Sequence, residues 1–156
     1  MIGFKFEKQN DGYLIHQEKY LKDILKRFNI EKYSPCSNIV PIINEELRKR
    51  RFDENLYRQA IRCLLYLVGC TRPDILFAVN KASRRTSNSN LEDWINVIKI
   101  FRYLKGNPKY GLKFKNSNPF DIYIDANYGG DTETSKSTTG YRIMMNGAPT
   151  SWYSIL

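Results

Sequence analysis

The sequence has 156 residues, and its 25 lysine and arginine residues against 16 aspartate and glutamate residues give a formal net charge of +9. Hydrophobic residues make up 42% of it, which is enough apolar material for one core or two small ones. No apolar run reaches the roughly 20 residues that a membrane span needs, and residues 1–5 are not typical of a secretory signal. We therefore expect a globular protein of the cytoplasm or nucleus with no membrane partner.

Residues 17–28 have the pattern of an amphipathic helix. An apolar stripe recurs at helical spacing and comprises Tyr20, Leu21, Ile24, Leu25 and Phe28. On another face, Lys19, Lys22 and Lys26 follow one another at intervals of three and four residues, with Arg27 beside them. Such a lysine row is either a solvated face or a surface that lies along a phosphate backbone.

After this helix the sequence becomes irregular. Pro35, Ser37 and Pro41 indicate a loop, and residues 45–51 form a run of charges without apolar periodicity. We expect a flexible basic loop here, with phosphate contact as the alternative.

Three further helices are predicted, each from its start signal. Asp53 caps a helix that buries Leu56, Ala60, Ile61, Leu64, Leu65 and Val68. Thr71 and Asp74 form a capping-box pattern, which gives Asp74 a structural rather than a catalytic role. Ser89 and Glu92 begin the last helix in the same way, and its apolar residues are Trp94, Ile95, Ile98, Phe101 and Leu104. Gly106 is expected to end it as a left-handed cap.

The remainder is predicted to be β-structure. Residues 111–115, 120–126, 140–145 and 150–153 are rich in β-branched and aromatic residues, and Asn146-Gly147 favours a tight hairpin turn. His16, the only histidine, lies in a similar alternating pattern, where a structural role is expected. Three cysteines, Cys36, Cys63 and Cys70, lack metal-ligand spacing and are predicted to be free thiols in a reducing compartment.

Asp125 is the most informative residue of the β-region. It lies near the end of a predicted strand and is followed by turn-forming residues 127–130. A carboxylate at such a position is either a metal ligand of a nuclease or an ordinary strand-end aspartate. Two-metal phosphoryl chemistry needs several ligands from separate elements, and Asp121, Asp131 and Glu133 lie nearby in edge or loop contexts.

The positive charge is unevenly distributed along the sequence. Residues 1–107 carry 20 basic and 12 acidic residues, a net of +8, whereas residues 108–156 carry 5 and 4, a net of +1. This asymmetry predicts that the first two-thirds of the chain faces a polyanion, with nucleic acid as the expected partner.

Short motifs follow one another along nearly the whole chain, among them Cys70-Thr71-Arg72-Pro73-Asp74-Ile75, Arg102-Tyr103-Leu104-Lys105-Gly106, Asp125 and Lys136-Ser137-Thr138-Thr139-Gly140-Tyr141. Their order and spacing resemble the Pol polyprotein of copia-type LTR retrotransposons, from the end of reverse transcriptase into ribonuclease H. Four positions depart from the family pattern: Arg62 replaces a glycine, Arg85 an aromatic residue, Asn127 an acidic residue and Tyr128 a tryptophan.

The resemblance implies an α+β fold of three parts. Residues 1–16 are similar to the primer-grip hairpin of reverse transcriptase, and residues 17–107 to its helical thumb and connection. Residues 108–156 are similar to the N-terminal part of a ribonuclease H-like domain with a truncated mixed β-sheet. The polymerase aspartates would then lie upstream of Met1, and the glutamate-bearing helix of ribonuclease H would follow residue 153.

These parts imply a remnant of an RNA-directed DNA polymerase and ribonuclease H, without activity of its own. Asp125 would be a vestigial catalytic residue, holding metal only in a complete site; the intact family enzyme uses Mg²⁺, and no cofactor is expected in this fragment. Lys19, Lys22, Lys26 and Arg27 would bind RNA or DNA duplexes or hybrids without sequence preference. Other parts of Pol are a further expected partner.

Two alternatives remain from the sequence. One is a co-opted protein that regulates related elements by binding nucleic acid or Pol. The other is an active nuclease that uses Asp125 with Asp121 and Asp131.

Overall fold

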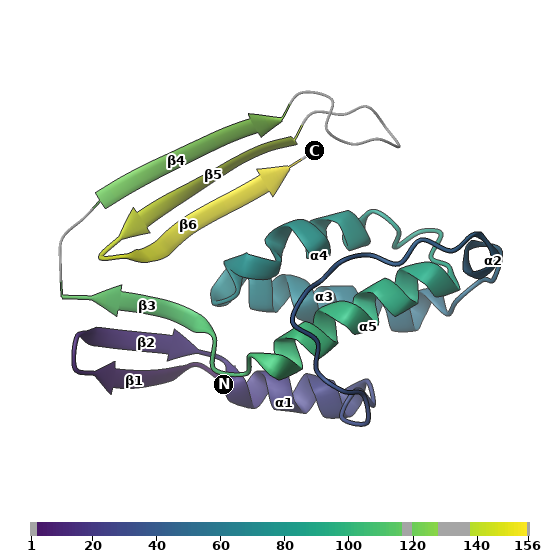
Figure 1. The fold of residues 1–156 in the computed structure, drawn as a ribbon, viewed down its shortest axis with the longest axis horizontal. Helices are drawn as coiled ribbons and strands as arrows, with labels where there is room; N and C mark the ends of the chain where they lie inside the picture. Colours follow the sequence, from purple (N-terminus) through teal and green to yellow (C-terminus); the bar gives the residue numbers. More distant parts are fainter. Residues whose placement is uncertain (1–2, 117–119, 128–137, 156) are drawn as a thin grey trace. The chain divides into compact units, whose positions relative to one another are not determined.

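The computed structural model describes residues 3–116, 120–127 and 138–155 (Figure 1). Within them the chain is an α+β protein, as expected, and it divides into two compact units. One unit comprises Met1–Phe4 with Gln17–Tyr110, and the other Lys5–His16 with Gly111–Leu156. In the described part, no helix combines the length and apolar character required to cross a membrane.

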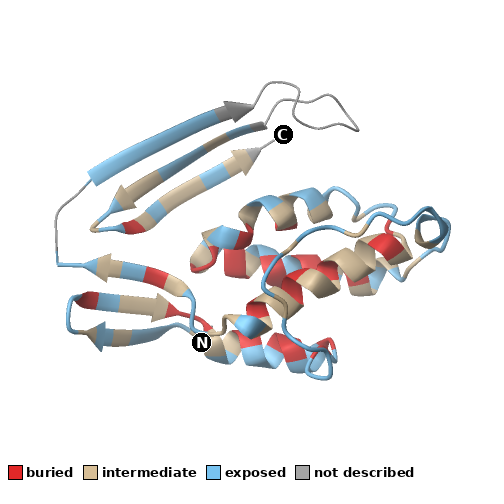
Figure 2. Cartoon of the chain, in the orientation of Figure 1, coloured by how far each residue is buried: buried red, intermediate tan, exposed pale blue. Residues whose placement is uncertain are grey.

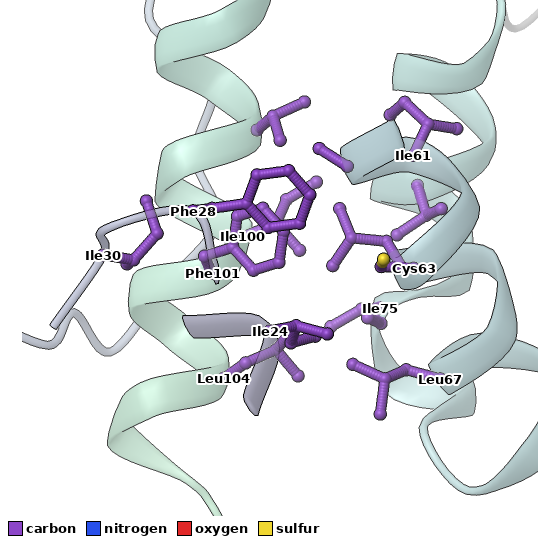
Figure 3. Packing of buried hydrophobic residues seen from close by; sticks show 14 of the residues in the cluster. Ile24, Phe28, Ile30, Ile61, Cys63, Leu67, Ile75, Ile100, Phe101 and Leu104 are labelled. Atoms are coloured by element: carbon purple, nitrogen blue, oxygen red, sulfur yellow. The ribbon is translucent and has the colours of Figure 1, made fainter. Parts of the chain in front are cut away.

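The first unit is helical. Its elements are α1 (Glu18–Arg27), α2 (Glu45–Arg48), α3 (Glu54–Cys70), the 3₁₀-helix η1 (Pro73–Ile75), α4 (Leu76–Ser83) and α5 (Leu91–Gly106). The apolar stripe predicted for residues 17–28 is confirmed, because Leu21, Ile24, Leu25 and Phe28 are all buried (Figure 2). They pack with side chains of α3, η1 and α5 in a single apolar cluster (Figure 3). Phe101 of α5 is fully buried in it and stacks on Phe28 with ring centroids 5.4 Å apart.

The start of α3 was predicted correctly, and the start of α5 was displaced by one residue. Asp53 caps α3 by accepting hydrogen bonds from the N–H groups of Asn55 and Leu56, at 2.9 and 3.2 Å. At α5 the capping box consists of Asn90 and Asp93, not of Ser89 and Glu92. Glu92 turns instead toward Arg48, whose Nε lies 3.0 Å from its Oε1.

The predicted capping box at Thr71 and Asp74 is wrong. The Thr71 hydroxyl donates to Gln17 Oε1 at 2.9 Å, and no side chain caps η1 or α4. Asp74 accepts hydrogen bonds from both Nε and Nη2 of Arg72, at 2.9 and 2.8 Å. Its expected structural role therefore holds through a different contact.

Two details of the helix predictions also fail. Leu65 is 40% exposed although its neighbour Leu64 is fully buried, because only one side of α3 faces the core. Gly106 does not adopt the left-handed conformation expected of a cap; α5 continues through it, and Asn107 follows with φ −131°.

The segment between α1 and α3 is more ordered than its sequence indicates. The predicted flexible loop at 45–51 contains α2, whose cap Asn44 accepts from the N–H groups of Glu46 and Leu47. Upstream, the Asn96 side chain of α5 accepts from the Ile42 N–H at 2.7 Å and donates to the Ile42 carbonyl at 3.1 Å. The backbone before α2 is thus held along α5.

The second unit contains two three-stranded sheets. One has the order β1 (Lys5–Gln9), β2 (Gly12–His16), β3 (Gly111–Lys115), and the other the order β4 (Phe120–Asn127), β5 (Thr138–Met145), β6 (Ala148–Ile155). The strands predicted from the sequence are confirmed within a few residues. A mixed sheet was expected, whereas every strand pair in the described ranges is antiparallel.

Glycines at two strand junctions adopt conformations with positive φ, and one of these junctions is the predicted Asn146-Gly147 turn. Asn146 and Gly147 have φ of 53° and 77°, which confirms the hairpin between β5 and β6. Gly12, at the start of β2, has φ +149°, and a Cβ there would lie 1.8 Å from the Phe114 carbonyl oxygen. Only glycine therefore permits β3 to pair at this point.

Candidate nucleic-acid interface

The predicted basic row lies on the exposed side of α1. Lys19, Lys22, Lys26 and Arg27 are all exposed, whereas the opposite stripe of the helix is buried in the core. With a rise of 1.5 Å per residue, the row extends roughly 10 Å from Lys19 to Lys26. The buried stripe anchors the helix, so the cations form a fixed array rather than a flexible tail.

The four cations differ in their partners. Lys22 donates to Glu18 at 2.7 Å, and Arg27 Nη2 donates to Gln59 Oε1 at 2.7 Å. Over the ranges that the structure describes, Lys19 and Lys26 have neither an ion pair nor a hydrogen bond from their ammonium groups. These two are therefore the residues of the row most available to an external anion.

Other cations of the helical unit are already engaged by the chain itself. Along α5, Lys99 donates to the Val40 carbonyl at 2.8 Å and Arg102 to the Ser34 carbonyl at 2.6 Å. Lys105 donates to the carbonyls of Glu31 and Tyr33, at 2.6 and 2.8 Å. A count of charge along the sequence treats these residues as equal to Lys19 and Lys26. The structure separates them, because the α5 cations hold the backbone of residues 31–40.

Arg72 is the most buried cation of this unit. Besides its two bonds to Asp74, it donates from Nη1 to the Asn107 carbonyl at 3.0 Å, and its guanidinium lies 5.7 and 5.6 Å from the ring centroids of Tyr103 and Tyr110. Burial and the neighbouring Asp74 carboxylate raise the pKa of the Tyr103 hydroxyl. All these groups are occupied with one another, so this cluster joins α5 to η1 and offers no free phosphate ligand.

Asp125 lies on β4 opposite Gly140 of β5, and its side chain is exposed. Asp121 lies on the same face of the strand but four residues earlier, at a distance of about 13 Å along it. Carboxylates bind divalent ions at only about 2.0–2.6 Å, so these two cannot share one ion. Asp131 and Glu133 lie outside the described residues. Within the described ranges, no three His, Cys, Asp or Glu residues come together as a metal site.

Arg62, one of the departures from the family pattern, lies between two α3 residues that contact α1. It is an exposed residue of α3, about one helical turn from Gln59 on one side and from Tyr66 on the other. Both neighbours contact α1: Gln59 bonds Arg27, and the Tyr66 ring lies 5.0 Å from that of Tyr20. Sequence reasoning could not find this position, because it depends on how α3 lies beside α1.

The chain is thus an α+β protein with an exposed cationic surface on a helix. Comparison of its sequence with known proteins identifies its family. The chain is 35% identical over its whole length to the retrovirus-related Pol polyprotein of transposon TNT 1-94 from Nicotiana tabacum. It is 30% identical over 98% of its length to the corresponding polyprotein of transposon RE2 from Arabidopsis thaliana. The chain belongs to the family of copia-type, retrovirus-related Pol polyproteins.

The match concerns a small part of these relatives. The chain spans 13% of the TNT 1-94 polyprotein and 11% of the RE2 polyprotein. A secreted RxLR effector protein of Plasmopara viticola is 35% identical over 63% of this chain, which corresponds to 70% of the effector. No family model and no solved structure matches the chain.

Proposed function

We propose that this chain is the Pol segment that runs from the thumb and connection of reverse transcriptase into ribonuclease H. In this proposal it binds RNA or DNA duplexes and hybrids without sequence preference and performs no catalysis itself. The observation that carries the binding function is the pair of exposed cations Lys19 and Lys26 on an anchored helix, neither of which has a partner among the described residues.

The physical basis is electrostatic. Lysines along a duplex replace counterions condensed on the phosphates, and their release drives binding that is insensitive to sequence and weakens as salt rises. A helix held by its buried stripe loses little freedom when it contacts the backbone, because its position is already set by the core. Lys22 and Arg27 would add to the array by exchanging their present surface contacts.

We propose no catalysis because of the carboxylates in the second unit. The family implies Mg²⁺ at a ribonuclease H site, to which Asp125 would contribute one oxygen ligand. The described residues do not make up such a centre, because Asp121 lies too far from Asp125 along β4 to share an ion with it. We therefore derive no catalytic step for this chain.

The test replaces Lys19, Lys22 and Lys26 together by glutamine and measures binding to a mixed-sequence RNA–DNA hybrid over a series of salt concentrations. The slope of log affinity against log salt should become shallower by about 2–3, since each of the three phosphate contacts contributes about 0.7–0.9. A control variant replaces the exposed lysines Lys32, Lys81 and Lys109, so that it loses the same charge outside α1. Equal slopes for the two variants, or no change in either, would show that the row is only a solvated face.

A second candidate function is a co-opted regulator that binds nucleic acid or Pol. The similarity to a secreted effector favours this second candidate. The matching segment makes up 70% of the effector, so a related segment forms most of a protein that is not named as a Pol polyprotein. The two proposals differ in how well protected the strands of the second unit are expected to be when the chain is studied alone.

A further inference from the structure

The seam between α1 and α3 is formed by long side chains of both helices. On α3 these are Gln59, which accepts from Arg27, and Tyr66, whose ring meets that of Tyr20 edge-on at 74°. Residues three and four apart lie on the same side of a helix. Arg62 is three residues after Gln59 and four before Tyr66, so it lies on the outer side of α3 along this seam.

Arg62 is an uncompensated charge in this position. Its side chain is exposed, and nowhere in the described ranges does it form an ion pair, a hydrogen bond or a ring contact. None of its neighbours on the same side of α3, three, four and seven residues away, is acidic: they are Asn55, Arg58, Gln59, Leu65, Tyr66 and Gly69. Arg58 is different, because it already pairs with Glu54 at 2.6 Å and donates to the Thr86 carbonyl at 3.1 Å.

We infer that Arg62 is a further phosphate-contacting residue and that the binding surface crosses the seam from α1 to α3. This inference rests on the proposed function and adds a second helix to the same site. The surface, the α1–α3 face, consists of Lys19, Lys26 and Arg27 from α1 and Arg62 from α3. Asp23, three residues after Tyr20 and four before Arg27, is the one carboxylate of α1 on the same side of the helix as these two residues, and the four cations outnumber it.

The chemistry of Arg62 suits a phosphodiester backbone. A guanidinium donates two parallel hydrogen bonds to the oxygens of one phosphate, which an ammonium group cannot do. The side chain needs no release from an existing partner, so contact costs only the ordering of its own rotamers. The lysines of α1 and the arginine of α3 would together hold the duplex along two lines rather than one.

The experiment compares Arg62→Gln, Arg62→Lys and the control Lys81→Gln in the full chain, with the same mixed-sequence hybrid. Lys81 is an exposed cation of α4, on the opposite side of the helical unit from α1 in Figure 1, and the control loses the same single charge. Arg62→Gln should make the salt slope shallower by about 1 and weaken binding on all sequences alike. Arg62→Lys should retain the slope, because it retains the charge, with a smaller loss of affinity.

Two results would overturn the inference. If the triple lysine variant weakens binding but Arg62→Gln matches Lys81→Gln, the α1 site stands and its extension to α3 is wrong. If Arg62→Gln weakens binding but leaves the salt slope unchanged, Arg62 supports the fold rather than contacting phosphate. Failure of the lysine variant as well would remove the proposed function itself.

Discussion

Arg48 of α2 and Glu92 of α5 are joined by a two-centre contact, in which the arginine Nε lies 3.0 and 3.1 Å from the two carboxylate oxygens. The same carboxylate accepts from the Asn44 N–H at 2.6 Å. The Glu92 side chain is only 7% exposed, whereas that of Arg48 is 43% exposed. A single buried carboxylate on α5 thus holds both the cap and the end of α2.

Glu92→Gln should lower the free energy of unfolding by about 1–3 kcal/mol, since the Asn44 N–H and Arg48 lose a buried, charged acceptor. The lower part of the range is expected, because solvent screens the exposed arginine. The measurement is urea unfolding, with Glu46→Gln as control, an exposed carboxylate in the first turn of α2. Equal values for both variants would contradict a specific role for Glu92.

Asp93 predicts a pH effect of defined sign. Burial raises the pKa of its carboxyl above the ordinary value of 3.8, and the Asn90 N–H and Arg85 oppose the shift. Between 3.8 and the raised value the folded state binds more protons than the unfolded state, so this group lowers stability as pH rises. The free energy of unfolding of the natural chain minus that of Asp93→Asn should therefore fall as pH rises through this window and then level off. A difference that increases with pH would contradict the assignment.

Catalysis is expected to be absent. The purified chain should neither extend a primer nor cleave RNA in a hybrid with Mg²⁺ or Mn²⁺, because Asp121 and Asp125 are about 13 Å apart along β4. Gel assays of both reactions check this. Cleavage that disappears in Asp125→Asn and persists in Asp121→Asn would revive the nuclease hypothesis with Asp125 as its metal ligand.

The two units should differ in local stability. Phe120, Ile122 and Ile124 of β4 are 63, 57 and 77% exposed, whereas the apolar side chains of α3 and α5 that face the core are almost fully buried. Few buried contacts permit local opening at low free energy. Hydrogen exchange should therefore be faster in β4, β5 and β6 than in α3 and α5, and proteolysis should begin beyond Asn107.

The hydrogen-exchange and proteolysis results also distinguish the two proposed functions. An exposed apolar strand is a route to aggregation, so a polyprotein segment studied alone should associate through this sheet. Uniform protection through Tyr153 in a soluble monomer would contradict the prediction and favour the co-opted regulator.

What could be predicted from the sequence depended on contacts within a few residues. The stripe of α1, the Asp53 cap and the Asn146-Gly147 turn are confirmed because helix periodicity, capping and turn conformation are local properties. The basic row was found in the same way, since spacing alone places Lys19, Lys22 and Lys26 on one face. Whether that row binds nucleic acid stays a prediction.

Tertiary structure decided everything that depends on distant partners. Thr71 was predicted to cap a helix, yet its hydroxyl bonds Gln17, 54 residues away. Leu64 and Leu65 are equal in sequence terms, but the packing of α3 against the rest of the core buries only Leu64. Lys99 and Arg62 are both cations on helices. Lys99 donates to the Val40 carbonyl, whereas Arg62 remains exposed beside the α1–α3 seam. A cation is more available to an external phosphate when the fold leaves it without a strong partner within the chain, and such a partner can lie far away in the sequence.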